Sequence, residues 1–359
     1  MRVAHIRVRS FRNVRDARVE PGPDVCVLYG ANAQGKTNFL EALYVLSNLQ
    51  SFRTHRLRDL LALDGAASQV EAEVQSRLGS TRLELLLETK GRQPRINGKP
   101  PKTTSEYLAE LPTVVFSPQD LLLARGSQDL RRRYLDRATF LANPGHLTVL
   151  RRYNRALRHR NAVLRSGGLA LEVWTQQVAR YGAEVHRGRR QTVARLHSTI
   201  EAIHTQIAGG DEQLEVECRP SFEGVSIEEA LLQRLADCEE RDRRMGHTGV
   251  GPHRDMVRIR LGGRNLDEHA SQGQMRTVAL GLKLALLQWG SEVRGTPPVF
   301  LLDDPGSELD GERLGTLGTF LTDWPGQVLI TGTQRNAVPL PATAEIRYYR
   351  VEQGVLNPE

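Results

Sequence analysis

The sequence predicts an α/β protein in which a mainly helical segment interrupts an α/β lobe. Apolar runs with strand spacing lie near both ends of the chain, whereas residues from about 103 to 245 follow helical periodicity. Strand patterns return after residue 245, so an insertion divides the α/β pattern. We therefore expect lobe I to comprise residues 1–112 and 293–359, and a mainly helical lobe II to comprise residues 113–292.

The N-terminal part of lobe I favours strands. Val25–Tyr29 is a continuous apolar run, which is typical of a strand covered on both faces, and the apolar residues after Thr37 have helical spacing. Further strands, which give this lobe an antiparallel β part, are expected at His5–Arg9, Ala17–Glu20, Val70–Val74 and Leu83–Leu87, with a tight turn at Asn97-Gly98.

The middle and C-terminal parts are predicted from the same patterns. A coiled-coil-like seam of apolar residues runs from Trp174 to Ile207 with one slip near Gly188, and it is too short for a long coiled-coil arm. A helix is expected at Ser271–Trp289. The remaining expected strands are Met256–Leu261, Val299–Asp303, Val328–Ile330 and Ile346–Tyr349.

Composition excludes some classes of protein and leaves others open. The chain of 359 residues has no apolar run long enough to span a membrane, and its first residues are too polar for a secretory signal, so we expect a cytoplasmic protein. Three widely spaced cysteines form neither a disulfide framework nor a metal cluster. The net charge of +7 permits contact with a polyanion without establishing it.

A phosphate-binding loop is the strongest motif. Between the Val25–Tyr29 run and a helical pattern lies Gly30-Ala31-Asn32-Ala33-Gln34-Gly35-Lys36-Thr37, which fits G-x-x-x-x-G-K-[ST]. Backbone N–H groups and the helix N-terminus favour phosphate oxygens there, so the loop and the adjoining Asn38 are expected to bind ATP. We expect Lys36 to reach the β- and γ-phosphates and Thr37 to bind Mg²⁺.

A second element of the phosphate site ends a buried strand. Asp303 follows the apolar run Val299–Leu302 and is expected beside Mg²⁺, while Asp304 is a candidate general base for the attacking water. The pattern is weak by itself, because strands that end in Asp-Asp before a turn are common. Its position after a phosphate-binding loop favours the functional interpretation.

Three further segments complete an order of motifs. Ser271-Gln272-Gly273-Gln274 precedes an apolar-periodic helix and is either a capping box, an S-x-G-Q signature that binds a γ-phosphate, or both. Ser307–Asp310 fits a D-loop or a capped helix start. After the Val328–Ile330 strand, Thr333 or Gln334 is a candidate γ-phosphate sensor.

This order of motifs is that of an ABC-ATPase head of the ABC/SMC type, and several stretches resemble the RecF family. The stretches that carry the resemblance are Gly35–Tyr44, Ser51–Thr54, Val115–Leu123 with Gly126 and Arg131–Asp136, Thr248–Asp255, and Asp303–Asp310. Together they extend over nearly the whole chain.

The RecF resemblance implies a two-lobe head that forms a homodimer when ATP is bound and hydrolyses ATP slowly. It implies binding to single-stranded DNA, duplex DNA and gap junctions, and action with RecO and RecR to load recombinase at single-stranded gaps. Support of replication restart and of the SOS response is also implied. On this basis Asp304, Lys36 and Ser271 are the expected catalytic residues, and Ser271, Gly273 and Gln274 close over the partner subunit's nucleotide.

Some positions depart from the general pattern. Asp304 stands where ABC ATPases have Glu, and Ala33 stands where many have Gly, which is tolerable if the backbone angles of Ala33 are ordinary. Gln119 and Gln50 are both candidates for the metal-facing glutamine of the Q-loop, and we prefer Gln119.

Arginine-rich runs provide a candidate DNA surface. Arg151–Arg160 contains no acidic residue, and Arg131–Arg133 precedes it; either the cluster binds DNA phosphates, or its arginines form a solvated helix face paired with carboxylates. Three other functions remain open: a transporter's nucleotide-binding subunit, an SMC-like structural clamp, and a DNA-binding module for which ATP is only a ligand.

Overall fold

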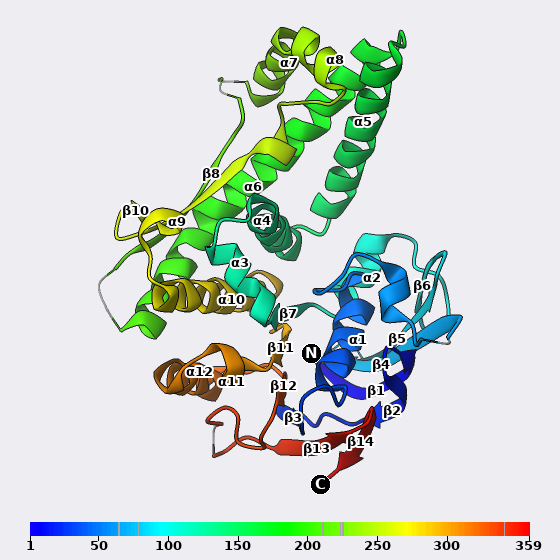
Figure 1. Ribbon diagram of the computed structural model, residues 1–359, viewed down its shortest axis with the longest axis vertical. Coiled ribbons are helices and arrows are strands. Elements are labelled where there is room, and N and C mark those ends of the chain that lie inside the picture. The colour runs from blue at the N-terminus through cyan, green and yellow to red at the C-terminus, as the bar shows by residue number, and fades with distance from the viewer. Residues whose placement is uncertain (64, 78, 210–211, 223, 225, 341) are drawn as a thin grey trace. The chain divides into compact units, whose positions relative to one another are not determined.

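The chain forms two compact units in the computed structural model, which describes residues 1–63, 65–77, 79–209, 212–222, 224, 226–340 and 342–359 (Figure 1). Unit 1 comprises Met1–Leu121, Gln206–Gly209 and Gln272–Glu359, and unit 2 comprises Leu122–Thr205 and Gly210–Ser271. Among the described residues, no helix is both long and apolar enough to cross a membrane.

Unit 1 is organised around a six-stranded sheet with the strand order β14-β13-β3-β12-β11-β7. All neighbouring pairs are parallel except β13 and β14, which form an antiparallel hairpin. Parallel strands align their carboxyl ends along one edge, where ligands bind in open α/β sheets. The strands are β3 (Val25–Tyr29), β7 (Thr113–Phe116), β11 (Val299–Asp303), β12 (Val328–Gly332), β13 (Ile346–Glu352) and β14 (Val355–Pro358).

An antiparallel sheet forms the second layer of unit 1, with the strand order β2-β1-β4-β5-β6. The helix α1 (Lys36–Asn48) packs against strands of both sheets and buries Phe39, Leu40 and Leu43 completely. The strands are β1 (Arg2–Phe11), β2 (Val14–Val19), β4 (Ala67–Ser76), β5 (Gly79–Glu88) and β6 (Gly91–Ile96). The other helices of this unit are η1 (Leu57–Leu60), α2 (Thr104–Glu110), η2 (Pro118–Asp120), α10 (Gln272–Arg294), α11 (Pro305–Glu308) and α12 (Gly311–Asp323).

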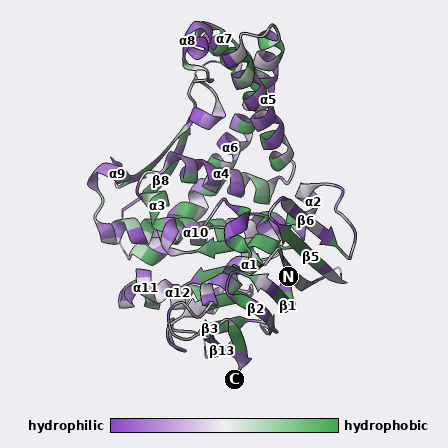
Figure 2. Ribbon diagram, turned by 45° about the vertical axis from the view of Figure 1, so that its right-hand side comes forward, coloured by the Kyte–Doolittle hydropathy of each residue, from purple (hydrophilic) through white to green (hydrophobic). Residues whose placement is uncertain are grey.

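Unit 2 is mainly helical. Its longest helix, α6 (Leu171–Ala208), buries Val178, Val185, Leu196 and Ile200 along the predicted apolar seam. In Figure 2 the helices α5 and α8 are mostly hydrophilic. The other helices are α3 (Leu121–Ala124), α4 (Gln128–Ala142), α5 (His146–Ser166), α7 (Ile227–Asp237), α8 (Glu239–Met245), η3 (Pro252–Arg254) and α9 (Leu266–His269). A small antiparallel sheet has the order β10-β9-β8, formed by β8 (Leu214–Arg219), β9 (Met256–Leu261) and β10 (Arg264–Asn265).

The units differ from the expected lobes in where residues 113–121, 206–209 and 272–292 belong. All three segments belong to unit 1. The physical reason is the strand β7, which pairs in parallel with β11 and supports α10 on its face. Periodicity did not predict β7, because a short, fully buried apolar run has no period of its own. The strand β8 was also not predicted, although Leu214, Val216 and Cys218 alternate with charged residues.

The expected turn at Asn97-Gly98 is confirmed. Both residues have positive φ, 50° and 77°, and Ile96 and Lys99 exchange two backbone hydrogen bonds of 2.8 and 3.0 Å across them. This is the geometry of a type I′ turn, which Asn-Gly favours.

Candidate nucleotide-binding site

The phosphate-binding loop connects β3 to α1, as the motif predicts. Gly30 and Gly35 have φ of 148° and 112°, in the region that favours glycine. A Cβ on Gly30 would lie 2.5 Å from the carbonyl oxygen of Val351, so glycine lets this loop lie directly against β13. The helix α1 begins at Lys36, and its N-terminal N–H groups follow the loop at the carboxyl edge of the sheet.

The backbone of Ala33 corrects one expectation. Its φ of 64° is left-handed, so the condition of ordinary backbone angles is not met. A left-handed alanine costs about 1–2 kcal/mol relative to its ordinary conformation. The loop therefore holds Ala33 in a conformation that glycine would adopt without this cost.

The side chain of Lys36 lies along its own loop. Its Nζ donates to the carbonyl oxygens of Gly30 and Ala31, both at 2.7 Å, and the residue is 6% exposed. Burial lowers the pKa of Lys36, and the negative charges of Asp304 and Asp303 oppose that shift. A buried cation surrounded by loop carbonyls fits the phosphate-binding role expected for this lysine.

Asp303 joins the two halves of the site. Thr37 Oγ1 donates to Asp303 Oδ1 at 2.7 Å, although the two residues are 266 positions apart. Thr331 Oγ1 donates to the same oxygen at 2.9 Å and accepts a hydrogen bond from the Asp304 amide at 2.9 Å. Thr331 lies on β12, the strand between β3 and β11, so one hydroxyl fixes both aspartates from the middle of the sheet.

The electrostatic environment of Asp303 suits a bound cation. The residue is 4% exposed, and this burial raises the pKa of its carboxyl group. Hydrogen bonds from Thr37 and Thr331 and the positive charge of Arg53 act in the opposite direction without cancelling the rise. A buried carboxylate beside a threonine hydroxyl is an oxygen donor set that fits Mg²⁺.

A buried carboxylate organises the polar groups beside the loop. Glu41 is fully buried in α1 and accepts hydrogen bonds from Arg12 at 2.6 and 2.9 Å and from Arg53 at 3.1 Å. Arg53 also donates to Asn38 Oδ1 at 2.7 Å. Sequence reasoning missed Glu41, although an acidic residue within a helix that is otherwise apolar on its buried side is a usable signal.

The C-terminal hairpin supports the loop from the other side. Gln34 accepts hydrogen bonds from the backbone N–H groups of Gln353 at 2.6 Å and Gly354 at 2.8 Å, through its side chain and its carbonyl oxygen respectively. Both donors lie in the turn between β13 and β14, a pairing that local patterns do not reveal.

The two candidate glutamines occupy different places. Gln119 is exposed in η2, just after β7, and β7 ends beside β11 at the carboxyl edge of the sheet. Asp120 stabilises this segment: it accepts a hydrogen bond from the Ser117 amide at 2.8 Å and forms an ion pair with Lys283 at 2.8 Å. Gln50 lies beyond the opposite end of α1, roughly 20 Å from Lys36 along a helix of 13 residues. This geometry favours Gln119.

The remaining motif residues lie at element ends. Ser271 is exposed and directly precedes α10, with Gly273 and Gln274 half-buried in its first turn. Asp310 caps α12 by accepting from the Arg313 amide at 3.0 Å, so the capping interpretation of this segment is confirmed. Thr333 and Gln334 are exposed just beyond β12, whereas the buried residue of that segment, Thr331, was not singled out from the sequence.

The arginine runs divide into interior and surface residues. Arg131 and Arg160 pair with Asp267 and Asp242, as the alternative interpretation expects, but both are buried and do not lie on a solvated helix face. The exposed members of the longer run are Arg151, Arg152, Arg155 and Arg158.

Fold and site together define an ATPase head of the ABC/SMC type. Residues 2–357 match the RecF/RecN/SMC N terminal domain family. Over 364 residues the chain is 37% identical to the DNA replication and repair protein RecF of Geobacter sulfurreducens, covering all of both chains. The chain therefore belongs to the RecF family and is an ATPase of that family.

Solved structures agree with this assignment. The ATP-bound structure of the recombination mediator protein RecF in the RecFOR pathway has a TM-score of 0.90 and 30% identity, covering 99% of this chain and 97% of that one. An SMC head bound to the C-winged helix domain of ScpA shares the fold, with a TM-score of 0.57, 13% identity, and coverage of 100% of this chain and 97% of that one. Full-length membership of the RecF family sets aside the transporter alternative.

Proposed function

We propose that this chain is an ATP-dependent DNA-binding protein of recombinational repair. ATP joins two copies into a dimer that clamps DNA at single-stranded gaps, and slow hydrolysis resets it. Membership of a family named for DNA replication and repair, and likeness to an ATP-bound recombination mediator, support this proposal.

In the proposed site, the loop from Gly30 to Asn38 binds the phosphates of ATP. Lys36 exchanges its two carbonyl contacts for phosphate oxygens, which restores a full set of partners to a buried cation. Thr37 and Asp303 would hold Mg²⁺, and Gln119, which follows the neighbouring strand, would be a further ligand. Bound there, Mg²⁺ would neutralise charge on the transferred phosphoryl group.

Asp304 is the proposed general base. It is half-buried, its amide is held by Thr331, and its φ of 47° and ψ of 54° turn the chain sharply into α11. In the proposed role, the Asp304 carboxylate polarises the attacking water.

The exposed signature completes the site of a second copy. Ser271, Gly273 and Gln274 stand at the start of a helix of 23 residues, whose N-terminus favours an anion. In the dimer this segment closes over the partner's γ-phosphate. Thr333, just beyond the end of β12 beside the chain's own loop, senses the γ-phosphate bound in its own site. ATP therefore favours the dimer only because it binds the dimer more tightly than the monomer.

The observation that carries the proposal is the hydrogen bond between Thr37 and Asp303, which unites the two phosphate-site motifs. Sedimentation over a wide range of protein concentration, with and without a non-hydrolysable ATP analogue, tests whether ATP drives dimerisation. We expect the analogue to double the mass of the wild type and to leave Ser271→Arg monomeric. An unchanged wild-type mass across the range would refute the ATP-driven dimer.

The proposed cellular role extends from this switch. The DNA-bound dimer acts with RecO and RecR to load recombinase, and so supports replication restart and the SOS response. The association of the similar solved structure with the RecFOR pathway supports this role. A reconstituted loading assay on gapped DNA checks it, because omission of the chain should slow loading only when gaps are present.

A further inference from the structure

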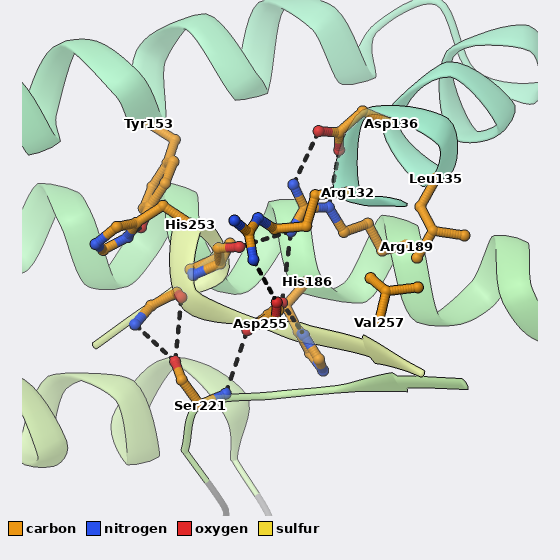
Figure 3. Close-up of polar contacts among 12 residues, drawn as sticks. Arg132, Leu135, Asp136, Tyr153, His186, Arg189, Ser221, His253, Asp255 and Val257 are labelled. Atoms are coloured by element: carbon orange, nitrogen blue, oxygen red, sulfur yellow. Dashed lines mark hydrogen bonds and ion pairs between the residues drawn. The ribbon is translucent and has the colours of Figure 1, made fainter. Parts of the chain in front are cut away.

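The polar interior of unit 2 that Figure 3 shows is a structural network. His186, Cys218 and Asp255 present possible metal-ligand atoms within 4.8 Å of one another. The carboxylate of Asp255, however, already contacts His186 Nδ1 at 3.0 Å and accepts a hydrogen bond from the Ser221 amide at 3.2 Å. The guanidinium of Arg189 lies 3.6 Å from the same carboxylate and adds a positive charge that opposes a bound cation. These contacts explain the cluster without a ligand.

Two motifs of unit 1 that are far apart in the sequence lie close together in the fold. The S-x-G-Q signature (Ser271–Gln274) leads into α10, and the D-loop segment (Ser307–Asp310) leads into α12. Figures 1 and 2 both show α10 and α12 as neighbours, and a hydrogen bond from Arg313 to Thr277 joins the two helices. Local periodicity does not predict this contact, because it does not say which helices pack together.

Arg313 connects the D-loop segment to α10. Its Nε donates to Thr277 Oγ1 at 2.8 Å, and its Nη1 forms an ion pair with Asp310 Oδ2. The backbone N–H of Arg313 donates to Asp310 Oδ1, the other oxygen of the same carboxylate, at 3.0 Å. One arginine therefore joins the last residue of the D-loop segment to the second turn of α10.

Thr277 extends the connection to the signature. Its hydroxyl donates to the carbonyl oxygen of Gly273 at 3.1 Å. A threonine that bonds the carbonyl four residues earlier is common within helices. Here the same hydroxyl oxygen also accepts a hydrogen bond from Arg313, so it both accepts and donates. We call this chain of contacts the signature relay; its members are Asp310, Arg313, Thr277 and Gly273.

The middle of the signature relay is shielded from water. Thr277 is 8% exposed and the side chain of Arg313 is 24% exposed, whereas Asp310 lies at the surface. The backbone N–H and the guanidinium charge of Arg313 lower the pKa of Asp310, so this carboxylate is ionised at neutral pH. Hydrogen bonds that are shielded from water are electrostatically stronger, and successive bonds polarise one another. The four groups are therefore held in one arrangement.

The two side-chain contacts at position 313 require a guanidinium group. Arginine presents its Nε–H and Nη–H donors in a planar fork of fixed geometry. The ammonium group of lysine is a compact point charge, so it can pair with Asp310 or reach Thr277 but does not reproduce both directions at once. Arg313→Lys therefore keeps the charge and breaks the relay.

We propose that Arg313 is a positioning residue that fixes the signature and the D-loop segment to one another, so that both meet the second copy of the chain as one preformed surface. The inference rests on the proposed ATP-driven dimer, in which the signature closes over the partner's γ-phosphate. A surface that is ordered before association loses less conformational entropy on binding. The signature relay thus favours the dimer and leaves nucleotide binding by the chain's own loop unchanged.

Sedimentation with a non-hydrolysable ATP analogue and Mg²⁺ tests the inference, because it gives the dissociation constant of the dimer. The variants are Arg313→Ala, Arg313→Lys, Thr277→Val, and the double variant that combines Arg313→Ala with Thr277→Val. Thr277→Ser keeps the hydroxyl, and the matched control Arg18→Ala removes an exposed arginine from β2 of the same unit. Nucleotide binding is measured at protein concentrations far below the dimer dissociation constant, and thermal unfolding verifies that each variant is folded.

We expect Arg313→Ala, Arg313→Lys and Thr277→Val each to raise the dissociation constant of the dimer by about tenfold. Ordering one mobile side chain on association weakens binding by about two- to tenfold, and each dimer contains two relays. The double variant should dimerise no more weakly than the single variants, since both changes break the same relay. Thr277→Ser and Arg18→Ala should dimerise like the wild type, and nucleotide binding by the monomer should be equal in all variants.

Three results would count against the proposals in different ways. Wild-type dimer dissociation constants in folded Arg313→Ala and Thr277→Val, even with lower unfolding temperatures, would overturn the positioning role and leave the ATP-driven dimer intact. Additive losses in the double variant would overturn the relay, because the two residues would then act separately. A wild-type protein that stays monomeric with the analogue would overturn the proposed function itself.

Discussion

Thr331→Val is the substitution that most directly perturbs the arrangement of the two aspartates. Thr331 is completely buried, donates to Asp303 Oδ1 at 2.9 Å and accepts from the Asp304 amide at 2.9 Å. Valine has nearly the same shape, so the sheet keeps its packing while both hydrogen bonds are lost. Of its two hydroxyl donors, Thr37 and Thr331, the carboxylate of Asp303 then retains only Thr37.

Two magnitudes follow from this geometry. A hydrogen bond to an ionised group contributes about 1.5–3 kcal/mol, so we expect the free energy of unfolding to fall by about 2 kcal/mol. Groups that orient a metal ligand typically change metal affinity by about 10–100-fold when removed. Because Thr331 orients Asp303, the Mg²⁺ concentration at half-maximal ATPase activity should rise by about tenfold.

The assay is a Mg²⁺ titration of ATP hydrolysis, accompanied by nucleotide binding in excess chelator. Thr331→Ser keeps the hydroxyl and should retain the wild-type Mg²⁺ requirement, while metal-free nucleotide binding should be unchanged in both variants. A folded Thr331→Val protein with the wild-type Mg²⁺ requirement and turnover would refute the assigned role of this residue.

Three further predictions test other parts of the site and of unit 2. Ala33→Gly should be at least as stable as wild type, because glycine removes the strain of the left-handed backbone. The control Ala31→Gly should lose about 0.5–1 kcal/mol of the free energy of unfolding, measured with denaturant. Equal losses in the two variants would contradict strain at Ala33. Asp304→Asn should abolish turnover while equilibrium dialysis still detects ATP binding, and retained turnover would exclude Asp304 as the base. Burial of Asp136 opposes its ionisation, but Arg189 and His146 lower its pKa to about 2. The ionised carboxylate therefore adds about 2 kcal/mol to the free energy of unfolding above pH 3.8, and this contribution is lost as the pH falls toward 2. Urea unfolding at pH 7 and pH 3 should show the stability gap between wild type and Asp136→Asn narrowing with acid, and a constant gap would refute the depressed pKa.

Much of the nucleotide site was predictable because its residues are local in sequence. The loop from Gly30 to Thr37 and the strand ending at Asp303 are each contiguous, and each depends on a strand signal that period and composition reveal. The antiparallel β part followed from alternating residues, since β4 and β5 bury every second side chain.

What sequence reasoning missed depends on tertiary pairing. Thr331 acquires its role only because β12 lies between β3 and β11. The strand β7 is four residues long and fully buried, so no alternation marks it. The left-handed backbone of Ala33 was also hidden, because alanine gives no local signal of positive φ.

The most direct test of the proposed switch is DNA binding measured by fluorescence anisotropy with gapped, single-stranded and duplex oligonucleotides. It is run with and without ATP, at two salt concentrations, for wild type, Lys36→Arg and Ser271→Arg. Binding that requires ATP and is lost in both variants is the predicted result, since one change disables the nucleotide loop and the other the segment that closes over the partner's nucleotide. Binding that is independent of ATP and of both substitutions would contradict an ATP-closed clamp.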